Sequence, residues 1–165
     1  MVINDGVNYL LTSRRRYDII STDAKTDPEH GVNGVFFSRE YYTLMRDRLA
    51  PGGLAIQWIP THYPPRIFKT VIHTCAEVFP HAQLWFSEGN CFLIASNHRL
   101  APDPEEIDRR LGDPELPFDG LRRFGLDSSA SLLAHLVATE DMLRQGTQGI
   151  PSNPLESPNV EFYTR

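Results

Sequence analysis

The chain has 165 residues, of which 41% are hydrophobic and 22% charged, and its formal net charge is −5. This length suits one domain with at most a small appendage, and the composition excludes an intrinsically disordered chain. The acidic balance argues against nucleic acid as the main partner, because phosphate binding requires a basic surface.

The first hundred residues alternate between apolar runs typical of strands and segments with helical periodicity. We expect strands at 1–4, 17–22, 53–59, 82–86 and 91–96 and helices at 7–12, 38–49 and 65–79. This alternation predicts an α/β fold with a parallel sheet, helices on both faces, and a closing hairpin. The run at 17–22 is almost continuously apolar, so we expect it to be covered on both faces.

The second part of the chain has a different character beyond Pro102. We expect a short charged helix at 104–111 and a longer helix from Asp127, as its cap, to about Arg144. The segment 149–165 is rich in proline, and we expect it to run extended over the surface.

The cysteines indicate a reducing environment. Cys75 and Cys91 are the only two, both have apolar neighbours, and no Cys/His spacing typical of zinc occurs, so we expect buried free thiols, no metal site and a cytoplasmic protein. No apolar run approaches the ~20 residues that span a bilayer. The start of the chain also lacks a signal-peptide pattern, so we expect no membrane association.

Acidic residues follow two of the predicted strands. Asp5 comes after the first and Asp23 after the second, with Asp27 close by. In open α/β sheets, ligands bind beyond the carboxyl ends of the strands. A single aspartate in such a place is usually a loop or helix cap, but two strand ends together favour a binding site. Gln57 and Tyr63, near the end of the next strand, belong either to the same pocket or to the core and loop.

Several motifs together resemble the second half of spermidine synthases, most closely the bacterial spermidine synthase-like proteins. The resemblance covers Ile3 to Asn97 and rests on NDGVNYLL, RYDIISTDAKTDP, FFSREYYTLMRDRLAPGGLAIQWIP and EVFPHAQLWF. The segment Asn153–Phe162 is also similar to a family ending, with Leu155-Glu156 in place of an acidic pair.

The resemblance implies a class I methyltransferase-like (Rossmann-like) α/β sheet of strand order 3-2-1-4-5-7-6. Residues 3–4 would then be strand three and residues 17–22 strand four. Residues 1–100 would form a partial aminopropyltransferase-type domain that is incomplete at its amino terminus. Residues 101–165 would form a small helical extension with a proline-rich tail.

The resemblance also implies a reaction, the transfer of an aminopropyl group from decarboxylated S-adenosylmethionine to a diamine such as putrescine, in polyamine biosynthesis. Asp23 matches the family's catalytic base and Asp27 its substrate-binding acid. Asp5 matches the acid that binds the adenine amino group, and Gly6 leaves room beside the ring. An amine of pKa near ~10 must lose a proton before it attacks, which a carboxylate at the reacting nitrogen promotes.

The sequence departs from the family pattern in two places. Three residues, Lys25 among them, separate Asp23 from Asp27, where the family has two. One added residue displaces a carboxylate by up to ~3.5 Å. In addition, no glycine-rich turn precedes Asp5, so the strand at 17–22 has no neighbour on one side and becomes an apolar edge.

These departures leave several interpretations open. The chain is either a fragment or a short protein that completes its sheet with the missing amino-terminal half or with a second copy, as a homo-oligomer. A methyltransferase that uses S-adenosylmethionine is the alternative enzyme. A catalytically inactive family member with a role in assembly is the alternative without catalysis.

Overall fold

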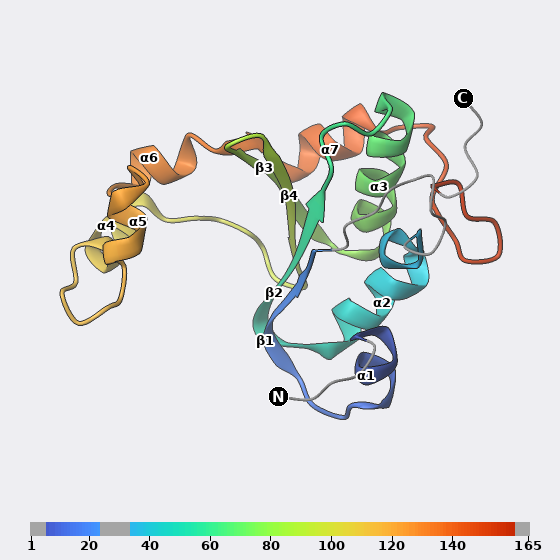
Figure 1. The fold of residues 1–165 in the computed structure, drawn as a ribbon, viewed down its shortest axis with the longest axis horizontal. Helices are drawn as coiled ribbons and strands as arrows, with labels where there is room; N and C mark the ends of the chain where they lie inside the picture. Colours follow the sequence, from blue (N-terminus) through green and yellow to red (C-terminus); the bar gives the residue numbers. More distant parts are fainter. Residues whose placement is uncertain (1–5, 24–33, 161–165) are drawn as a thin grey trace.

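The computed structural model describes residues 6–23 and 34–160, which form one five-stranded sheet with helices packed against it (Figure 1). The elements in chain order are α1 (Gly6–Thr12), β1 (Tyr17–Thr22), the 3₁₀ helix η2 (Gly34–Phe37), α2 (Arg39–Arg48), β2 (Leu49–Ile59), α3 (Pro65–Val78), β3 (His81–Ser87), β4 (Asn90–Ser96), α4 (Pro104–Leu111), α5 (Asp119–Arg123), α6 (Ser129–Leu133), β5 (Leu136–Ala138) and α7 (Glu140–Gly146). The strands and helices expected before residue 112 are confirmed, apart from the strand at 1–4, which lies outside the described residues.

The strands lie in the order β1-β2-β4-β3-β5. The first four confirm the 4-5-7-6 part of the order that the resemblance implied, and β5 is added beyond β3. Only β1 and β2 are parallel; all other neighbours are antiparallel, so the expectation of a parallel sheet is wrong beyond β2. The reason is the tight turn at Glu88 and Gly89, whose φ angles of 49° and 81° return β4 directly alongside β3.

The helices α1 to α3 all lie on one side of the sheet (Figure 1). Ala55 and Ile59 of β2 point to that side and are buried, whereas Ile56 and Trp58 alternate with them and are only half-buried. A right-handed β1–α2–β2 crossover places its helix on one side only, and no helix of the described residues covers β1 and β2 on the other. The expectation of helices on both faces is therefore wrong for this part of the chain.

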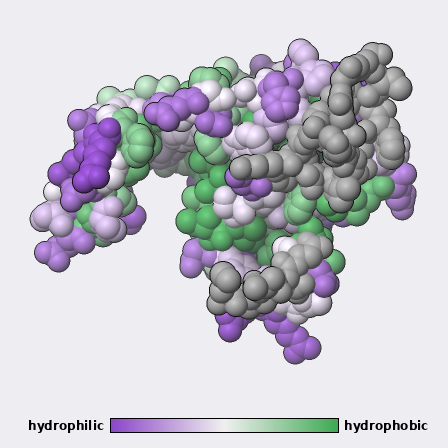
Figure 2. All heavy atoms as spheres, in the orientation of Figure 1, coloured by the Kyte–Doolittle hydropathy of each residue, from purple (hydrophilic) through white to green (hydrophobic). Residues whose placement is uncertain are grey.

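We call the uncovered side the open face. It carries Ile19, Ser21, Ile56, Trp58, Phe92, Ile94 and Trp85. Figure 2 shows hydrophobic surface gathered in the hollow between this side of the sheet and the arm formed by α4 to α6. Within residues 6–23 and 34–160, β1 pairs with β2 alone, so it is an edge strand of the sheet that the structure describes. Its expected burial on both faces is wrong, because the side chain of Ile19 is 60% exposed.

Gly53 lets β1 approach β2 closely. A Cβ at this position would lie 2.8 Å from the carbonyl oxygen of Tyr17 and 3.1 Å from that of Asp18, so any larger residue would push the strands apart. The register between the two strands shifts at this point, directly after Tyr17. Residues 51–53, which were expected to end the preceding helix, lie inside β2, because α2 runs straight into that strand.

The predicted starts of the two long helices are confirmed. Ser38 caps α2, and its Oγ accepts a hydrogen bond of 3.1 Å from the backbone N–H of Tyr41. Pro65 occupies the first position of α3, where its missing N–H costs no hydrogen bond.

The helix expected from Asp127 to Arg144 is wrong. Two short helices, α6 and α7, flank the strand β5, and Ser128 rather than Asp127 caps α6. The expected helix is interrupted because a distant segment pairs with it. β5 pairs with the outer edge of β3, and the backbone N–H of Phe86 donates to the carbonyl of His135 at 2.8 Å. The division into residues 1–100 and 101–165 stays a prediction, although β5 and α7 return to the sheet.

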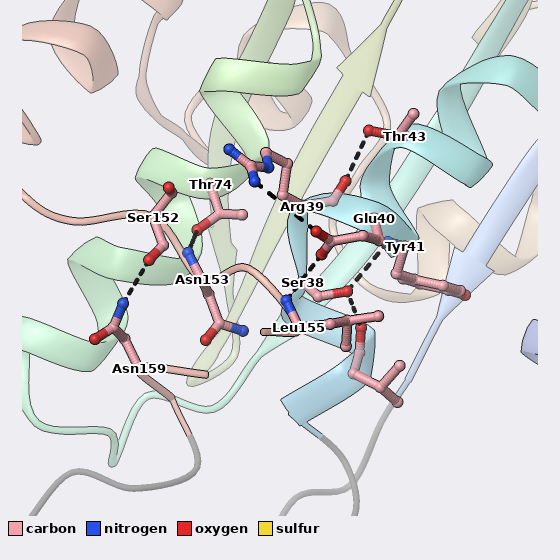
Figure 3. Close-up of polar contacts among 11 residues, drawn as sticks. Ser38, Arg39, Glu40, Tyr41, Thr43, Thr74, Ser152, Asn153, Leu155 and Asn159 are labelled. Carbon is pink, nitrogen blue, oxygen red and sulfur yellow. Dashed lines mark hydrogen bonds and ion pairs between the residues drawn. The ribbon is translucent and has the colours of Figure 1, made fainter. Parts of the chain in front are cut away.

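The tail does not simply lie extended on the surface, because Asn153 is fully buried. Its backbone N–H donates to Thr74 Oγ1 at 2.9 Å, and its carbonyl accepts from the N–H of Arg39 at 3.0 Å (Figure 3). In its side chain, Nδ2 donates to the carbonyl of Gly34 at 3.2 Å and Oδ1 accepts from the N–H of Val160 at 3.0 Å. Asn153 therefore ties the tail to η2, α2 and α3.

Replacing Asn153 with alanine should lower the free energy of unfolding by about 2–4 kcal/mol, because the carbonyl of Gly34 and the N–H of Val160 lose their buried partners. Chemical denaturation measures this change. Asn159→Ala is the control: Asn159 is half-buried and its Nδ2 makes one bond, to the carbonyl of Ser152, so its loss should be about 1 kcal/mol or less. Equal losses in the two variants would contradict the anchoring role.

Glu140 joins α7 to the start of β3, since its Oε2 lies 2.8 Å from His81 Nδ1 and its Oε1 3.3 Å from Arg144 Nε. Burial acts to raise the pKa of Glu140, but these two partners outweigh it and lower the pKa below the ordinary 4.5. A lowered folded-state pKa adds stability above about pH 4.5, which is lost as the pH falls through the lowered value.

At neutral pH, Glu140→Gln should therefore be less stable than the parent chain, and this difference should vanish on acidification. Denaturation at a series of pH values measures it. The exposed Glu105 on α4 provides the control variant Glu105→Gln, for which we expect a smaller difference. A difference for Glu140→Gln that grows with acidification would contradict this assignment.

Candidate functional site

Asp23 directly follows the carboxyl end of β1, and its side chain is exposed. Gly6 begins α1, and a Cβ added to it would meet no atom within 4 Å. The two other predicted acids, Asp5 and Asp27, lie outside the described residues.

A cavity of about 460 Å³ opens beside Asp23 on the open face. It is lined by Ser21, Thr22, Asp23, Ile56, Trp58, Asn90 and Phe92. The lining comes from the ends of three neighbouring strands, β1, β2 and β4. Among these lining residues Asp23 is the only charged one, and hydrophobic and aromatic side chains of β2 and β4 form the opposite wall.

The strand register explains why these side chains meet. Thr22 is opposite Gln57 in the β1–β2 pair, so the next position after β1, Asp23, comes level with Trp58. Trp58 is in turn opposite Phe92 in the β2–β4 pair. Alternation along each strand sends Asp23, Trp58 and Phe92 to the same side of the sheet, where they form one row.

The indole of Trp58 is held in place from the hairpin turn. Its Nε1–H donates to Asn90 Oδ1 at 3.0 Å, and Asn90 Nδ2 donates to the carbonyl of Glu88 at 3.1 Å. Thr61 Oγ1 also donates to the carbonyl of Gly89 at 3.2 Å, which ties the end of β2 to the same turn. The orientation of the ring is therefore fixed by polar contacts at one edge.

Gln57 and Tyr63 point away from this cavity and are not among its lining residues. Gln57 is 2% exposed, its Nε2 donates to the carbonyl of Trp58 at 3.0 Å, and its Oε1 has no hydrogen-bond partner among the described residues. Tyr63 is 5% exposed and packs edge-on against Phe37, with ring centres 6.1 Å apart. The structure therefore does not bring these two side chains together with Asp23.

The two thiols are buried, and the described residues hold no metal cluster. Cys75 and Cys91 are free and buried, as predicted, and burial raises the pKa of the Cys75 thiol to about 12. Within the part of the chain that the structure describes, no group of three His, Cys, Asp or Glu side chains is arranged to hold a metal ion. The described helices are all too short or too polar to cross a membrane.

Sequence reasoning missed Trp58, Asn90 and Phe92 as parts of the site. Trp58 adjoins Gln57, and alternation along the strand indicates that only one of the two can face a given side. Phe92 and Asn90 carry no such signal, because their place depends on β4 lying between β2 and β3.

Comparison with known proteins finds relatives by sequence and shared folds among solved structures. Residues 1–88 match the family model described as the spermine/spermidine synthase domain. A polyamine aminopropyltransferase of Synechococcus sp. is 30% identical over 160 residues, which is 87% of this chain and 51% of that protein.

Solved structures agree with this match at the level of the fold. The crystal structure of a probable spermidine synthase from Corynebacterium glutamicum matches with a TM-score of 0.64 at 17% identity, over 98% of this chain and 56% of that one. A spermidine synthase in complex with the transition-state analogue AdoDATO matches with a TM-score of 0.59 at 20% identity, over 88% and 50%. The chain thus spans about half the length of these proteins.

Replacing Gln57 with methionine should change the free energy of unfolding by less than about 1 kcal/mol. The loss of the bond from Nε2 to the carbonyl of Trp58 is offset by removal of a buried oxygen that has no partner among the described residues. Gln83→Met is the matched control. Gln83 is also buried, but its Nε2 donates to the carbonyl of Leu100 and its Oε1 accepts from Trp85 Nε1, so its replacement should cost about 1–2 kcal/mol. Denaturation curves of both variants give the two changes in the free energy of unfolding. A larger loss of stability in Gln57→Met than in Gln83→Met would contradict the expectation.

Proposed function

Because the chain belongs to the spermine/spermidine synthase domain family, we propose that it takes part in aminopropyl transfer from decarboxylated S-adenosylmethionine to a diamine such as putrescine. The observation that carries this proposal is the position of Asp23, the one carboxylate among the described residues that line a cavity with aromatic and aliphatic walls near the carboxyl ends of β1 and β2. The name of the Synechococcus relative supports the same reaction.

In this reaction Asp23 acts as the base. The amine nitrogen forms a bond to the aminopropyl carbon while the bond from that carbon to sulfur breaks. The electron pair of the broken bond stays on sulfur, methylthioadenosine leaves, and the carboxylate accepts the proton from nitrogen. A free alkylammonium has a pKa near ~10, so the diamine enters the cavity charged. Its nitrogen gives one proton to the Asp23 carboxylate before it attacks.

The other site assignments are part of the same proposal. Asp27 anchors the second ammonium of the diamine, while Asp5 and Gly6 contact the adenine of the co-substrate. Gln57 and Tyr63 lie buried on the covered side of the sheet and do not line the cavity, so they have no part in this proposal. A cytoplasmic location fits the two free thiols.

We further propose that the chain acts as part of an assembly, either with a second copy or with a polypeptide that supplies the missing amino-terminal half. Two observations support this: the chain spans about half the length of its relatives, and β1 has no strand on its outer edge among the described residues while the side chain of Ile19 is exposed. The same edge supports the alternative that the chain serves assembly without catalysis.

The catalytic proposal predicts that Asp23→Asn lowers the rate of methylthioadenosine release by about 100-fold or more, as expected for loss of a general base. The assay supplies decarboxylated S-adenosylmethionine and putrescine and follows methylthioadenosine by chromatography. Asp18→Asn is the control, because Asp18 is an exposed carboxylate on the same strand and does not line the cavity. Full activity of Asp23→Asn, or no release by the parent chain, would contradict the proposal.

The assembly proposal predicts a mass in light scattering of at least twice the 18.8 kDa of one chain, or complex formation with an added amino-terminal half. Ile19→Lys should reduce this association, because it places a charge on the strand edge. Leu11→Lys is the control: Leu11 is 59% exposed, close to the 60% of Ile19, but lies on α1. A well-folded monomer that binds no other chain would contradict assembly.

A further inference from the structure

The row formed by Asp23, Trp58 and Phe92 has two chemically different parts. One end is a carboxylate, and the remainder is an aromatic surface contributed by cross-strand partners. A carboxylate beside aromatic rings is a suitable environment for an organic cation, which gains from the charge and from the ring faces together.

The described lining residues present no competing charge. No lysine, arginine or histidine is among the seven described residues that line the cavity. An ammonium that enters therefore meets one negative charge and no repulsion from these seven side chains. An anion meets only repulsion from Asp23, and a neutral alcohol gains neither attraction.

The contacts of Trp58 decide which part of the ring is available. Because its Nε1–H is occupied by Asn90 Oδ1, the indole has no polar group left for a ligand. What it offers to the cavity is its carbon framework, whose π system attracts cations. Trp85 differs: it lies farther along the same row, on β3, donates to Gln83, and does not line the cavity.

We infer that Trp58, positioned by Asn90, determines the specificity of the cavity for a primary alkylammonium group through a cation–π contact beside Asp23. This inference rests on the proposed function, since a diamine is the ligand, but it concerns ligand choice rather than transfer. It adds to the site a residue whose role is to distinguish charged from neutral ligands of the same length.

Two tryptophans in the chain allow a direct test. In a ¹H–¹⁵N spectrum of the full chain, two indole peaks are expected, and Trp85→Phe assigns them by leaving only that of Trp58. Titration with 1,4-diaminobutane should shift the Trp58 peak and leave the Trp85 peak in place. Titration with 1,4-butanediol, the neutral match, should shift neither. A shift of Trp58 by the diol to the same extent, or a shift of Trp85 alone by the diamine, would overturn the inference.

The affinity for 1,4-diaminobutane, measured by calorimetry, distinguishes the contribution of the aromatic ring of residue 58 from an effect of the substitution on the fold. Trp58→Phe and Trp58→Leu both lose the bond to Asn90, but only phenylalanine keeps an aromatic face. We expect Trp58→Leu to bind about five- to thirty-fold more weakly than Trp58→Phe. Equal affinities in the two variants, with matching melting curves, would overturn the inference.

The transfer assay keeps this inference separate from the proposed reaction. A parent chain that shifts the Trp58 peak with diamine but releases no methylthioadenosine refutes transfer and supports the cation site. A chain that transfers normally after Trp58→Leu, with an unchanged KM for the diamine, refutes the cation site alone.

Discussion

The register between β1 and β2 is the constraint on which the site depends. The pairing of Thr22 with Gln57 fixes how far β1 extends along β2, and so determines that Asp23 comes level with Trp58. Gly53 permits this pairing, because a side chain there would collide with the carbonyl of Tyr17. A slip of one residue would send Asp23 to the covered side of the sheet, away from the cavity. The register between β1 and β2 therefore determines whether Asp23 can take any of the chemical roles proposed for it.

The open face has two consequences that belong together. It leaves the cavity accessible, and it leaves apolar side chains such as Ile19 in contact with water. Protein surfaces seldom leave a strand edge and an apolar face uncovered side by side without a partner. The helical side, by contrast, is held to the tail by Asn153, which makes three hydrogen bonds to distant segments. One side of the sheet is therefore complete within this chain, and the other is suited to assembly.

Local signals in the sequence were sufficient for the elements whose ends carry their own chemistry. Ser38 and Pro65 begin helices as expected, and the apolar run at residues 17–22 is a strand. The errors arise where pairing with a distant segment decides. Residues 136–138 have helical neighbours yet form a strand, because the edge of β3 accepts them. Asn153 gave no sign of burial, since three of its four bonds reach partners more than 70 residues away.

The site shows the same division. The position of Asp23 at the end of β1 was predictable, because it directly follows a strand-like apolar run, and its chemical role stays a prediction. The places of Phe92 and Asn90 depend on strand order. A crystal structure of the chain with 1,4-diaminobutane tests the central claim most directly. We expect one ammonium nitrogen of the diamine to lie about 2.7–2.9 Å from a carboxylate oxygen of Asp23 and over the ring of Trp58. A diamine bound elsewhere, with Asp23 turned to solvent, would contradict it.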